Sequence, residues 1–231
     1  MDLLKDLNEA QQQAVSYIDG PSLVIAGAGS GKTRVLTYKI AYLLQQGMKP
    51  WSIMALTFTN KAAREMKERI GKLVGNDLAQ HLYMGTFHSI FSRILRAEAE
   101  HIGFNSNFTI YDETDSRSLL KAIVKEKGLD EKIYKPAAVH AKISMAKNNL
   151  MSAEAYEADA DIFMQNKRNN MQKMGEVYKE YVQRCKQANA MDFDDLLVLT
   201  FQLFRDHEEV RRKYAERFDY ILVDEYQDTN H

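Results

Sequence analysis

The chain has 231 residues, of which 45% are hydrophobic and 27% are charged, and its formal net charge is -1. These proportions are typical of a soluble globular protein and exclude a disordered chain, and the balanced charge excludes a generally basic nucleic-acid binder. A single cysteine excludes a disulfide framework and a multi-cysteine zinc site. No apolar run reaches the roughly 20 residues of a membrane helix. We therefore expect a cytoplasmic protein without a membrane partner.

The first third of the chain predicts alternating strands and helices. An apolar run at 22–26 leads into a glycine cluster, as buried parallel strands often do, and a helical stripe of apolar residues follows at 32–46. A second strand is expected at 53–56, a helix from about 60–74, and a weaker third strand at 82–84. This alternation indicates a doubly wound α/β fold, a parallel sheet with helices on both faces.

The remainder of the chain is different. From about residue 89 to residue 216 the pattern is almost entirely helical, broken by one strand-like run at 108–111, and a buried-strand pattern returns at 220–223. We therefore expect residues 1–88 and 217–231 to form one α/β domain and residues 89–216 to form a largely helical insertion. Because the chain stops just past a strand, we also expect it to be the N-terminal portion of a longer protein, with the α/β domain incomplete.

A glycine-rich loop joins the first expected strand to its helix, with the sequence Ala26-Gly27-Ala28-Gly29-Ser30-Gly31-Lys32-Thr33. It departs from the pattern G-x-x-x-x-G-K-[ST] only in the alanine at the leading position. The backbone N–H groups of such a loop converge on phosphate oxygens at a helix N-terminus. Lys32 is expected to reach the β- and γ-phosphates and Thr33 to ligate Mg²⁺. A loop that served only as a structural turn would not need Lys32 or Thr33. A dinucleotide-binding loop would have the different spacing G-x-G-x-x-G. Both alternatives are therefore disfavoured.

Two acidic residues follow the last expected strand. Asp224 and Glu225 come directly after 220–223, which places them at the carboxyl end of a parallel strand, on the same sheet edge as the glycine-rich loop. Adjacent strand residues point to opposite faces. We therefore expect Asp224 to complete the Mg²⁺ shell and Glu225 to face the water that attacks the γ-phosphate. The loop and the acids together predict a site for a nucleoside triphosphate and Mg²⁺.

Five motifs follow one another in the sequence. They are LNEAQQ at 7–12, AGAGSGKTR at 26–34, TFTNKAAREM at 57–66, GTFHS at 85–89 and VDEYQDTN at 223–230. With these motifs the chain resembles, over its whole length, the UvrD/Rep/PcrA family of superfamily 1 DNA helicases, and within it the PcrA-type bacterial enzymes. Its acidic motif has the form D-E-x-Q, which separates it from D-E-A-D and D-E-x-H helicases. The resemblance implies a RecA-like P-loop NTPase domain.

The resemblance also implies roles for individual residues. Gln11 would read the adenine edge of ATP with its amide, Arg34 would lie near the nucleotide, and Gln227 would sense the γ-phosphate. Single-stranded DNA would contact side chains at two strand ends, by stacking and through phosphate or sugar contacts. These side chains are Phe58, Thr59 and Asn60 after the second expected strand, and Thr86 and His88 after the third. Taken alone, any of them would more often be a core, cap or surface residue.

The function that the resemblance implies is that of an ATP-dependent DNA helicase or translocase with 3′→5′ polarity. It would be a cytoplasmic, nucleoid-associated bacterial enzyme acting on single-stranded DNA and duplex junctions, with repair or replication proteins as partners. Lys32, Asp224, Glu225 and Gln227 would be its catalytic residues in this portion. A second motor domain would supply arginines at the γ-phosphate, so residues 1–231 alone are expected to hydrolyse little ATP.

Three alternatives stay open from the residues themselves. The chain could belong to a RecB- or AddA-like helicase–nuclease, to a P-loop enzyme that does not act on DNA, such as a small-molecule kinase, or to a non-catalytic DNA-binding module. Intact Lys32, Thr33, Asp224 and Glu225 argue against the last of these.

Two further groups of polar residues receive structural interpretations. Asp192, Asp194 and Asp195 precede an expected helix, so we interpret them as its N-terminal cap. Histidines at 81, 88, 101, 140 and 207 show no ligand spacing with Cys185, so the sequence gives no reason to place a metal cluster among them.

Overall fold

The computed structural model describes residues 3–27 and 29–229. Ala28, one of the residues predicted in the phosphate loop, lies outside the described residues, and so does Asn230 at the end of the last motif.

The chain forms two compact units. The first, which we call the α/β unit, comprises Met1–Ile90 and Arg211–His231, and the second, the helical unit, comprises Phe91–Val210. The assignment of residues 1–88 with 217–231 and of residues 89–216 as functional domains stays a prediction.

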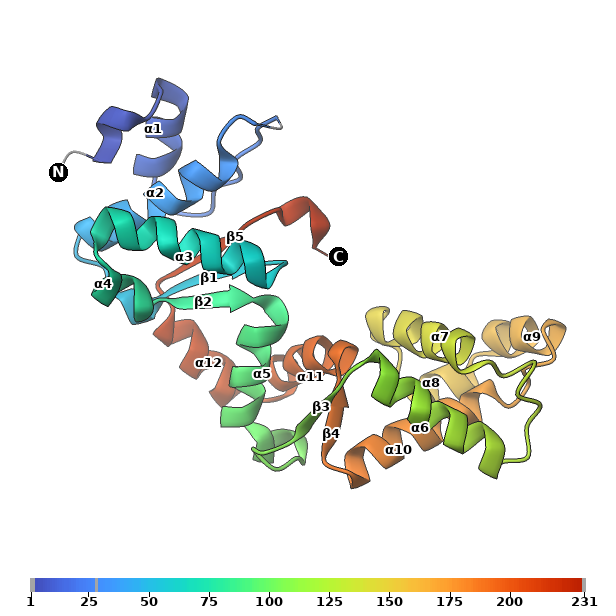
Figure 1. The fold of residues 1–231 in the computed structure, drawn as a ribbon. Coiled ribbons are helices and arrows are strands. Elements are labelled where there is room, and N and C mark those ends of the chain that lie inside the picture. The colour runs from blue at the N-terminus through green and yellow to red at the C-terminus, as the bar shows by residue number, and fades with distance from the viewer. Residues whose placement is uncertain (1–2, 28, 230–231) are drawn as a thin grey trace. The chain divides into compact units, whose positions relative to one another are not determined.

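A three-stranded parallel sheet forms the centre of the α/β unit (Figure 1). Its order is β2-β1-β5, with β1 at Ile53–Thr57, β2 at Tyr83–Thr86 and β5 at Tyr220–Val223. All five residues of β1 are buried, as expected for the central strand of a parallel sheet. The predicted α/β class with a parallel sheet is therefore confirmed.

The helices of the α/β unit are η1 (Leu3–Asp6), α1 (Glu9–Ser16), α2 (Lys32–Gln45), η2 (Pro50–Ser52), α3 (Asn60–Val74), α4 (Asn76–Gln80), the first residues of α5 (Phe87–Ala97), most of α12 (Glu208–Arg217) and η4 (Tyr226–Asp228). Two of them, α2 and α3, begin at their predicted positions, and the others had no predicted start. Thr59 caps α3, because its hydroxyl accepts a hydrogen bond from the N–H of Ala62.

Helices cover both faces of this sheet. On one face, buried residues of α2 and α3 pack against β1 and β5, and Met84 of β2 joins this core; its buried members are Ile40, Leu43, Ile53, Ala55, Met66, Ile70, Ala79, Leu82 and Leu222. The neighbouring strand residue, Tyr83, points to the opposite face. There its ring lies 5.0 Å from the ring of Phe218, which follows α12. The α2/α3 pair and the end of α12 therefore lie on opposite sides of the strands.

The predicted strand at 22–26 is wrong. This segment has no regular secondary structure, and its apolar side chains are exposed: 66% for Leu23, 41% for Val24 and 90% for Ile25. The apolar run was read as a buried strand, but a parallel strand is stable only between neighbours that satisfy its backbone and cover its side chains. Within the described residues β5 is the edge of the sheet, and its Ile221 is 56% exposed.

The described elements of the helical unit include six complete α-helices, one 3-10 helix and a pair of short strands. These are η3 (Ala99–Ile102), β3 (Thr109–Tyr111), α6 (Glu113–Glu126), α7 (Pro136–Asn148), α8 (Ala153–Ala158), α9 (Ala160–Arg168), α10 (Met174–Gln187), β4 (Ala190–Asp192) and α11 (Phe193–Asp206). The strands β3 and β4 pair in parallel. β3 matches a predicted strand-like run, whereas β4 was not predicted. Among the described helices, none has both the length and the apolar composition needed to cross a membrane.

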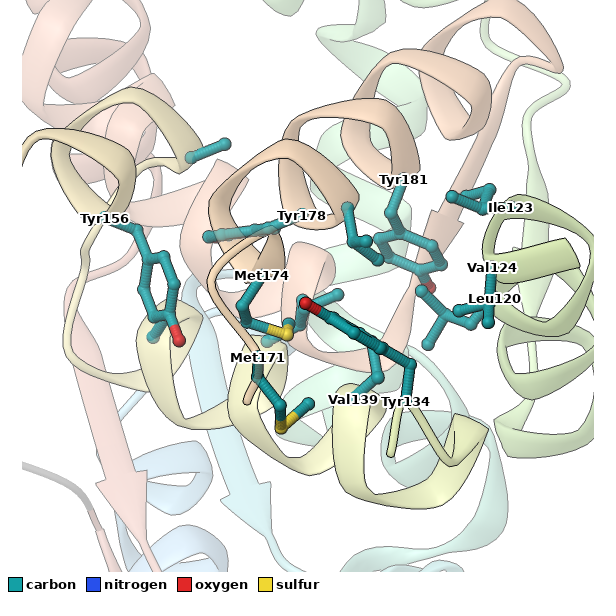
Figure 2. Close-up of a cluster of buried hydrophobic side chains, with 14 of the residues drawn as sticks. Leu120, Ile123, Val124, Tyr134, Val139, Tyr156, Met171, Met174, Tyr178 and Tyr181 are labelled. Carbon is teal, nitrogen blue, oxygen red and sulfur yellow. The ribbon is translucent and has the colours of Figure 1, made fainter. Parts of the chain in front are cut away.

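Figure 2 shows the core of the helical unit, which α6, α7, α8 and α10 share. Tyr181 lies at its centre and is fully buried. Tyr156 and Tyr178 meet edge to face, with ring centroids 5.7 Å apart. Such an arrangement places the positive edge of one ring against the negative face of the other. Burial of large side chains of this kind stabilises the unit by roughly 1.5–3 kcal/mol each.

A charged network is buried beside this core. The ammonium of Lys147 on α7 lies 2.6 Å from Asp192 and 2.7 Å from Asp195, and the hydroxyl of Tyr181 lies 2.9 Å from the same Asp192 oxygen. Asp192 also caps α11 by accepting the N–H of Asp195, which confirms the cap interpretation for this residue. Burial alone lowers the pKa of Lys147, but the two carboxylates outweigh it, so this pKa lies well above its ordinary value.

Cys185 on α10 is expected to be chemically inert in the folded protein. It is 3% exposed, and burial, followed by the negative charge of Asp195, raises the pKa of its thiol to about 12. Only the thiolate reacts with alkylating reagents. Iodoacetamide at pH 8 should therefore leave Cys185 unmodified in the native protein and alkylate it in 6 M guanidinium chloride, as mass spectrometry of the intact chain would show. Rapid alkylation without denaturant would contradict this expectation.

Candidate functional site

The carboxyl ends of the three parallel strands lie level with one another. Thr57 of β1 pairs with Thr86 of β2, and Leu56 pairs with Val223 of β5. The N–H of Asp224 still donates to Leu56 O at 2.9 Å, so the ladder extends one residue past β5. Residues that follow these three strands are therefore brought to one edge of the sheet, where parallel α/β proteins bind their ligands.

The glycine-rich loop ends at the N-terminus of α2. Gly31 caps this helix in the left-handed conformation, with φ of 88°, and Gly29 also has a positive φ of 74°. A Cβ atom on Gly31 would lie 2.9 Å from Nε2 of Gln11, so both the backbone and the space favour glycine. The ammonium of Lys32 lies 3.3 Å from the carbonyl oxygens of Ala26 and Gly27. The side chain of Lys32 therefore folds back onto the loop that precedes its helix.

The charge of Lys32 acts on one residue of the acidic pair. Burial and then the negative charge of Glu225 raise the pKa of Asp224 above its ordinary value. The N–H of Glu225, which donates to Asp224 Oδ1 at 3.2 Å, and more weakly the positive charge of Lys32 act in the opposite direction. Lys32 and Asp224, 192 positions apart in the sequence (224 − 32), are therefore near enough in the fold for their charges to interact.

This site has suitable ligands for Mg²⁺. The hydroxyl of Thr33, in the first turn of α2, and the half-buried carboxylate of Asp224 are both oxygen donors, which Mg²⁺ prefers. Their metal-binding role stays a prediction.

The backbone at Glu225 is strained. Its φ of 52° and ψ of 50° lie in the left-handed region, which a residue with a Cβ atom seldom adopts. Its carboxylate accepts a hydrogen bond of 2.5 Å from Nε2 of Gln227 in η4. Strained residues of this kind cluster at functional sites, where the surrounding structure holds a side chain in a required direction. Glu225 is exposed and is thus accessible to a ligand at the sheet edge.

Gln11 has a structural role in this conformation. It forms a capping box with Asn8 at the start of α1: its N–H donates to Asn8 Oδ1, and its own Oε1 accepts the N–H of Asn8. Its Nε2 donates to Ser30 O at 3.1 Å and so ties α1 to the glycine-rich loop. The contact with adenine stays a prediction.

Arg34 points toward the N-terminal segment. Its guanidinium donates to Asp6 O at 2.6 Å and lies 5.3 Å from the ring centre of Tyr38. Its predicted place near the nucleotide is therefore not visible in this conformation and stays a prediction.

The first predicted DNA-contact patch contains an aromatic pair. Phe58 is 41% exposed, and its ring lies 5.2 Å from that of Phe87, at the start of α5. Phe58 was a predicted contact and Phe87 was not, although Phe87 lies in the same GTFHS motif as the predicted contacts Thr86 and His88. Thr59 is the cap of α3, and Asn60 is exposed in its first turn.

In the second patch, Thr86 is 8% exposed and its hydroxyl accepts the N–H of Ser89. It therefore supports the start of α5. His88 is half-buried in the first turn of that helix. The contacts of both residues with DNA stay predictions.

The helical unit contains a cluster of possible metal ligands that the spacing of residues in the sequence did not predict. His101, His207 and Glu209 place their ligating atoms within 4.8 Å of one another. The two histidines are 106 positions apart (207 − 101), so only the fold brings them together.

Comparison with known proteins gives one consistent family. Residues 7–231 match the model of the UvrD/REP helicase N-terminal domain. Proteins named ATP-dependent DNA helicase PcrA are 44% identical in Leuconostoc citreum and 46% identical in Bacillus subtilis (strain 168) and Staphylococcus aureus (strain COL), each over 229 residues. Each match covers 99% of this chain and 30% of the relative, so the chain spans less than a third of the length of these relatives. The chain belongs to the UvrD/REP helicase N-terminal domain family.

Proposed function

We propose that this chain is the ATP-binding N-terminal part of an ATP-dependent DNA helicase of the PcrA type. The proposal is supported by the position of Asp224 directly after β5 and by the effect of the Lys32 charge on the pKa of Asp224. The names of the relatives, which describe ATP-dependent DNA helicases, support it. Their similarity over almost the whole chain favours this function over a small-molecule kinase or a RecB- or AddA-like subunit.

In this proposal the glycine-rich loop and the N-terminus of α2 hold the triphosphate through backbone N–H groups. Lys32 leaves the loop carbonyls and binds the β- and γ-phosphate oxygens. Thr33 and Asp224 hold Mg²⁺, which when bound neutralises negative charge on those phosphates. Glu225 accepts a proton from the attacking water, and Gln227, hydrogen-bonded to Glu225, links this base to the γ-phosphate.

Single-stranded DNA is proposed to cross the neighbouring strand ends. The exposed ring of Phe58 offers a face on which a base can stack without sequence preference. Asn60, the Thr59 cap, Thr86 and His88 provide polar groups near phosphate and sugar.

Several features of the whole protein belong to the proposal as well. They are 3′→5′ translocation, action at duplex junctions, a cytoplasmic and nucleoid-associated location, repair or replication partners, and a second motor domain that completes the ATP site.

The proposal is tested by measuring binding with residues 1–231 and turnover with the full-length protein. Residues 1–231 should bind ATP in the presence of Mg²⁺ but hydrolyse it slowly, while the full-length protein should hydrolyse ATP faster when single-stranded DNA is added. Lys32→Ala should weaken ATP binding by about 10- to 150-fold, the loss expected when a charged hydrogen-bonding group is removed. Isothermal titration calorimetry and a coupled ATPase assay measure the two quantities.

Lys49→Ala is the matched control, because Lys49 is exposed and precedes η2, away from the loop. It should bind ATP as the unchanged chain does. Full-length turnover that is equal with and without DNA would favour a P-loop enzyme acting on another substrate. Rapid DNA-stimulated hydrolysis by residues 1–231 would contradict the need for a second motor domain.

A further inference from the structure

Two histidines and a glutamate meet in the helical unit, far along the chain from the residues proposed to bind ATP. His101 lies in η3, His207 caps the C-terminus of α11, and Glu209 lies in the first turn of α12. The Oε1 atom of Glu209 lies 3.6 Å from Nδ1 of His101 and 3.4 Å from Nδ1 of His207. The two imidazole rings stand edge to face, with centroids 5.0 Å apart.

Two of these separations match those of atoms that share one metal ion. Zinc binds histidine nitrogen and carboxylate oxygen at about 2.0–2.2 Å, so two ligands at a tetrahedral angle lie roughly 3.4 Å apart. Both distances from Glu209 are close to this value, and all three ligand atoms lie within 4.8 Å of one another, so binding an ion would draw the two imidazoles slightly together. Two imidazoles and one carboxylate form a set that holds Zn²⁺ and leaves a position for water, whereas Mg²⁺ and Ca²⁺ prefer oxygen ligands alone.

A fourth side chain lies beside one of the histidines. Oε2 of Glu98 lies 3.8 Å from Nε2 of His101, and Glu98 is only 6% exposed. This separation is too long for a hydrogen bond, but the negative charge favours the proton on Nε2 and so leaves Nδ1 for the cluster. Histidines that ligate a metal usually donate their other ring N–H to a carboxylate, and Glu98 is the carboxylate that could take this role when an ion is bound.

The backbone around the cluster is held by hydrogen bonds. The N–H of His101 donates to Glu98 O at 3.1 Å, and the N–H of His207 donates to Leu203 O at 3.0 Å. The two imidazoles line a surface hollow of about 470 Å³, and their side chains are 38% and 31% exposed. An ion with its water ligands can therefore reach the cluster from solvent.

We propose that His101, His207 and Glu209 bind one Zn²⁺ ion and that Glu98 positions His101 for this. The ion would join η3 to the junction of α11 and α12, which are linked to each other through His207. Because the site forms only in the folded chain, Zn²⁺ would stabilise the fold by mass action.

The test uses residues 1–231 freed of metal by a chelator. Zn²⁺ is titrated in competition with a chromophoric chelator, and Co²⁺ is used as a second probe because its visible absorption reports tetrahedral coordination by nitrogen and oxygen. We expect one ion per chain and a higher melting temperature with Zn²⁺. Glu98→Gln should weaken Zn²⁺ binding by about 10- to 100-fold, and His101→Ala or His207→Ala should weaken it more.

His140→Ala is the matched control, since His140 lies on α7 of the same unit and outside the cluster. It should bind Zn²⁺ with unchanged affinity, and far-UV circular dichroism should show that all variants fold. Zinc binding that survives His101→Ala combined with His207→Ala would overturn the proposal, as would an equal loss in His140→Ala. Neither readout involves ATP, so this result is independent of the proposed helicase function.

Discussion

Glu225→Gln is expected to lower the DNA-stimulated ATP turnover of the full-length protein by about 10²- to 10⁴-fold, the contribution typical of a general base. The amide has nearly the same size as the carboxylate but cannot accept a proton from water. It does not remove Lys32 or Thr33 of the phosphate loop, so ATP and Mg²⁺ should still bind. Steady-state ATPase assays at saturating DNA, together with equilibrium binding of ATP, separate the two effects.

Asp228→Asn provides the control for this prediction. Asp228 is an exposed acid of the same motif and the last residue of η4. The proposed mechanism assigns it no contact with the phosphates. Its replacement should leave turnover within a few-fold of the unchanged enzyme. If Glu225→Gln kept more than a tenth of the activity, the assignment of Glu225 as the base would have to be abandoned.

Lys147→Met is expected to destabilise the protein by about 3–5 kcal/mol, the cost of removing one partner from a buried ion pair. The substitution leaves the carboxylates of Asp192 and Asp195 close together and without the ammonium that lies 2.6 Å and 2.7 Å from them. Urea unfolding followed by far-UV circular dichroism measures the change in the free energy of unfolding.

Two further variants identify the cause of that loss. Lys142→Met changes a half-buried lysine of the same helix and should alter stability by no more than about 0.5 kcal/mol. Adding Asp192→Asn to Lys147→Met should restore part of the stability, because asparagine keeps the cap of α11 while removing one buried negative charge. A loss below about 1 kcal/mol for Lys147→Met would show that the buried charges contribute little.

Two groups contribute to the pH dependence of this network. The pKa of Lys147 is raised, so its contribution is fully present below its unfolded pKa of about 10.4 and is lost only as the pH rises through the folded value. Burial raises the pKa of Asp195 to about 6, so this residue adds stability as the pH falls through that value. The stability supplied by Lys147 should therefore decline only under strongly alkaline conditions, which urea unfolding at a series of pH values would measure.

Local patterns predicted most of the α/β unit. The helix α3 begins and ends at its predicted residues, 60 and 74, because apolar residues recur at helical spacing and Thr59 supplies a cap. The strand at 22–26 was predicted wrongly, because an apolar run reports burial only when neighbouring strands are there to cover it. β4 was missed, since three residues are too few to show a period and its partner β3 lies 81 positions earlier (190 − 109).

In the candidate site, features set by neighbouring residues could be predicted, whereas contacts between distant residues could not. The glycine-rich loop and the Asp224–Glu225 pair can be recognised from their spacing, because backbone curvature and strand ends are local properties. The second role of Gln11, as a capping residue that also bonds the loop at Ser30, depends on how α1 packs. The meeting of His101 with Glu209 depends on the fold of the helical unit, which no short motif encodes.

The uncovered edge of β5 has a consequence for handling this polypeptide. Beyond β5 the described residues provide no further strand, and Ile221 of this edge strand is exposed. An open apolar edge of this kind is a template on which another chain can add a strand. We therefore expect concentrated solutions of residues 1–231 to self-associate, and a charged substitution such as Ile221→Lys to improve their solubility.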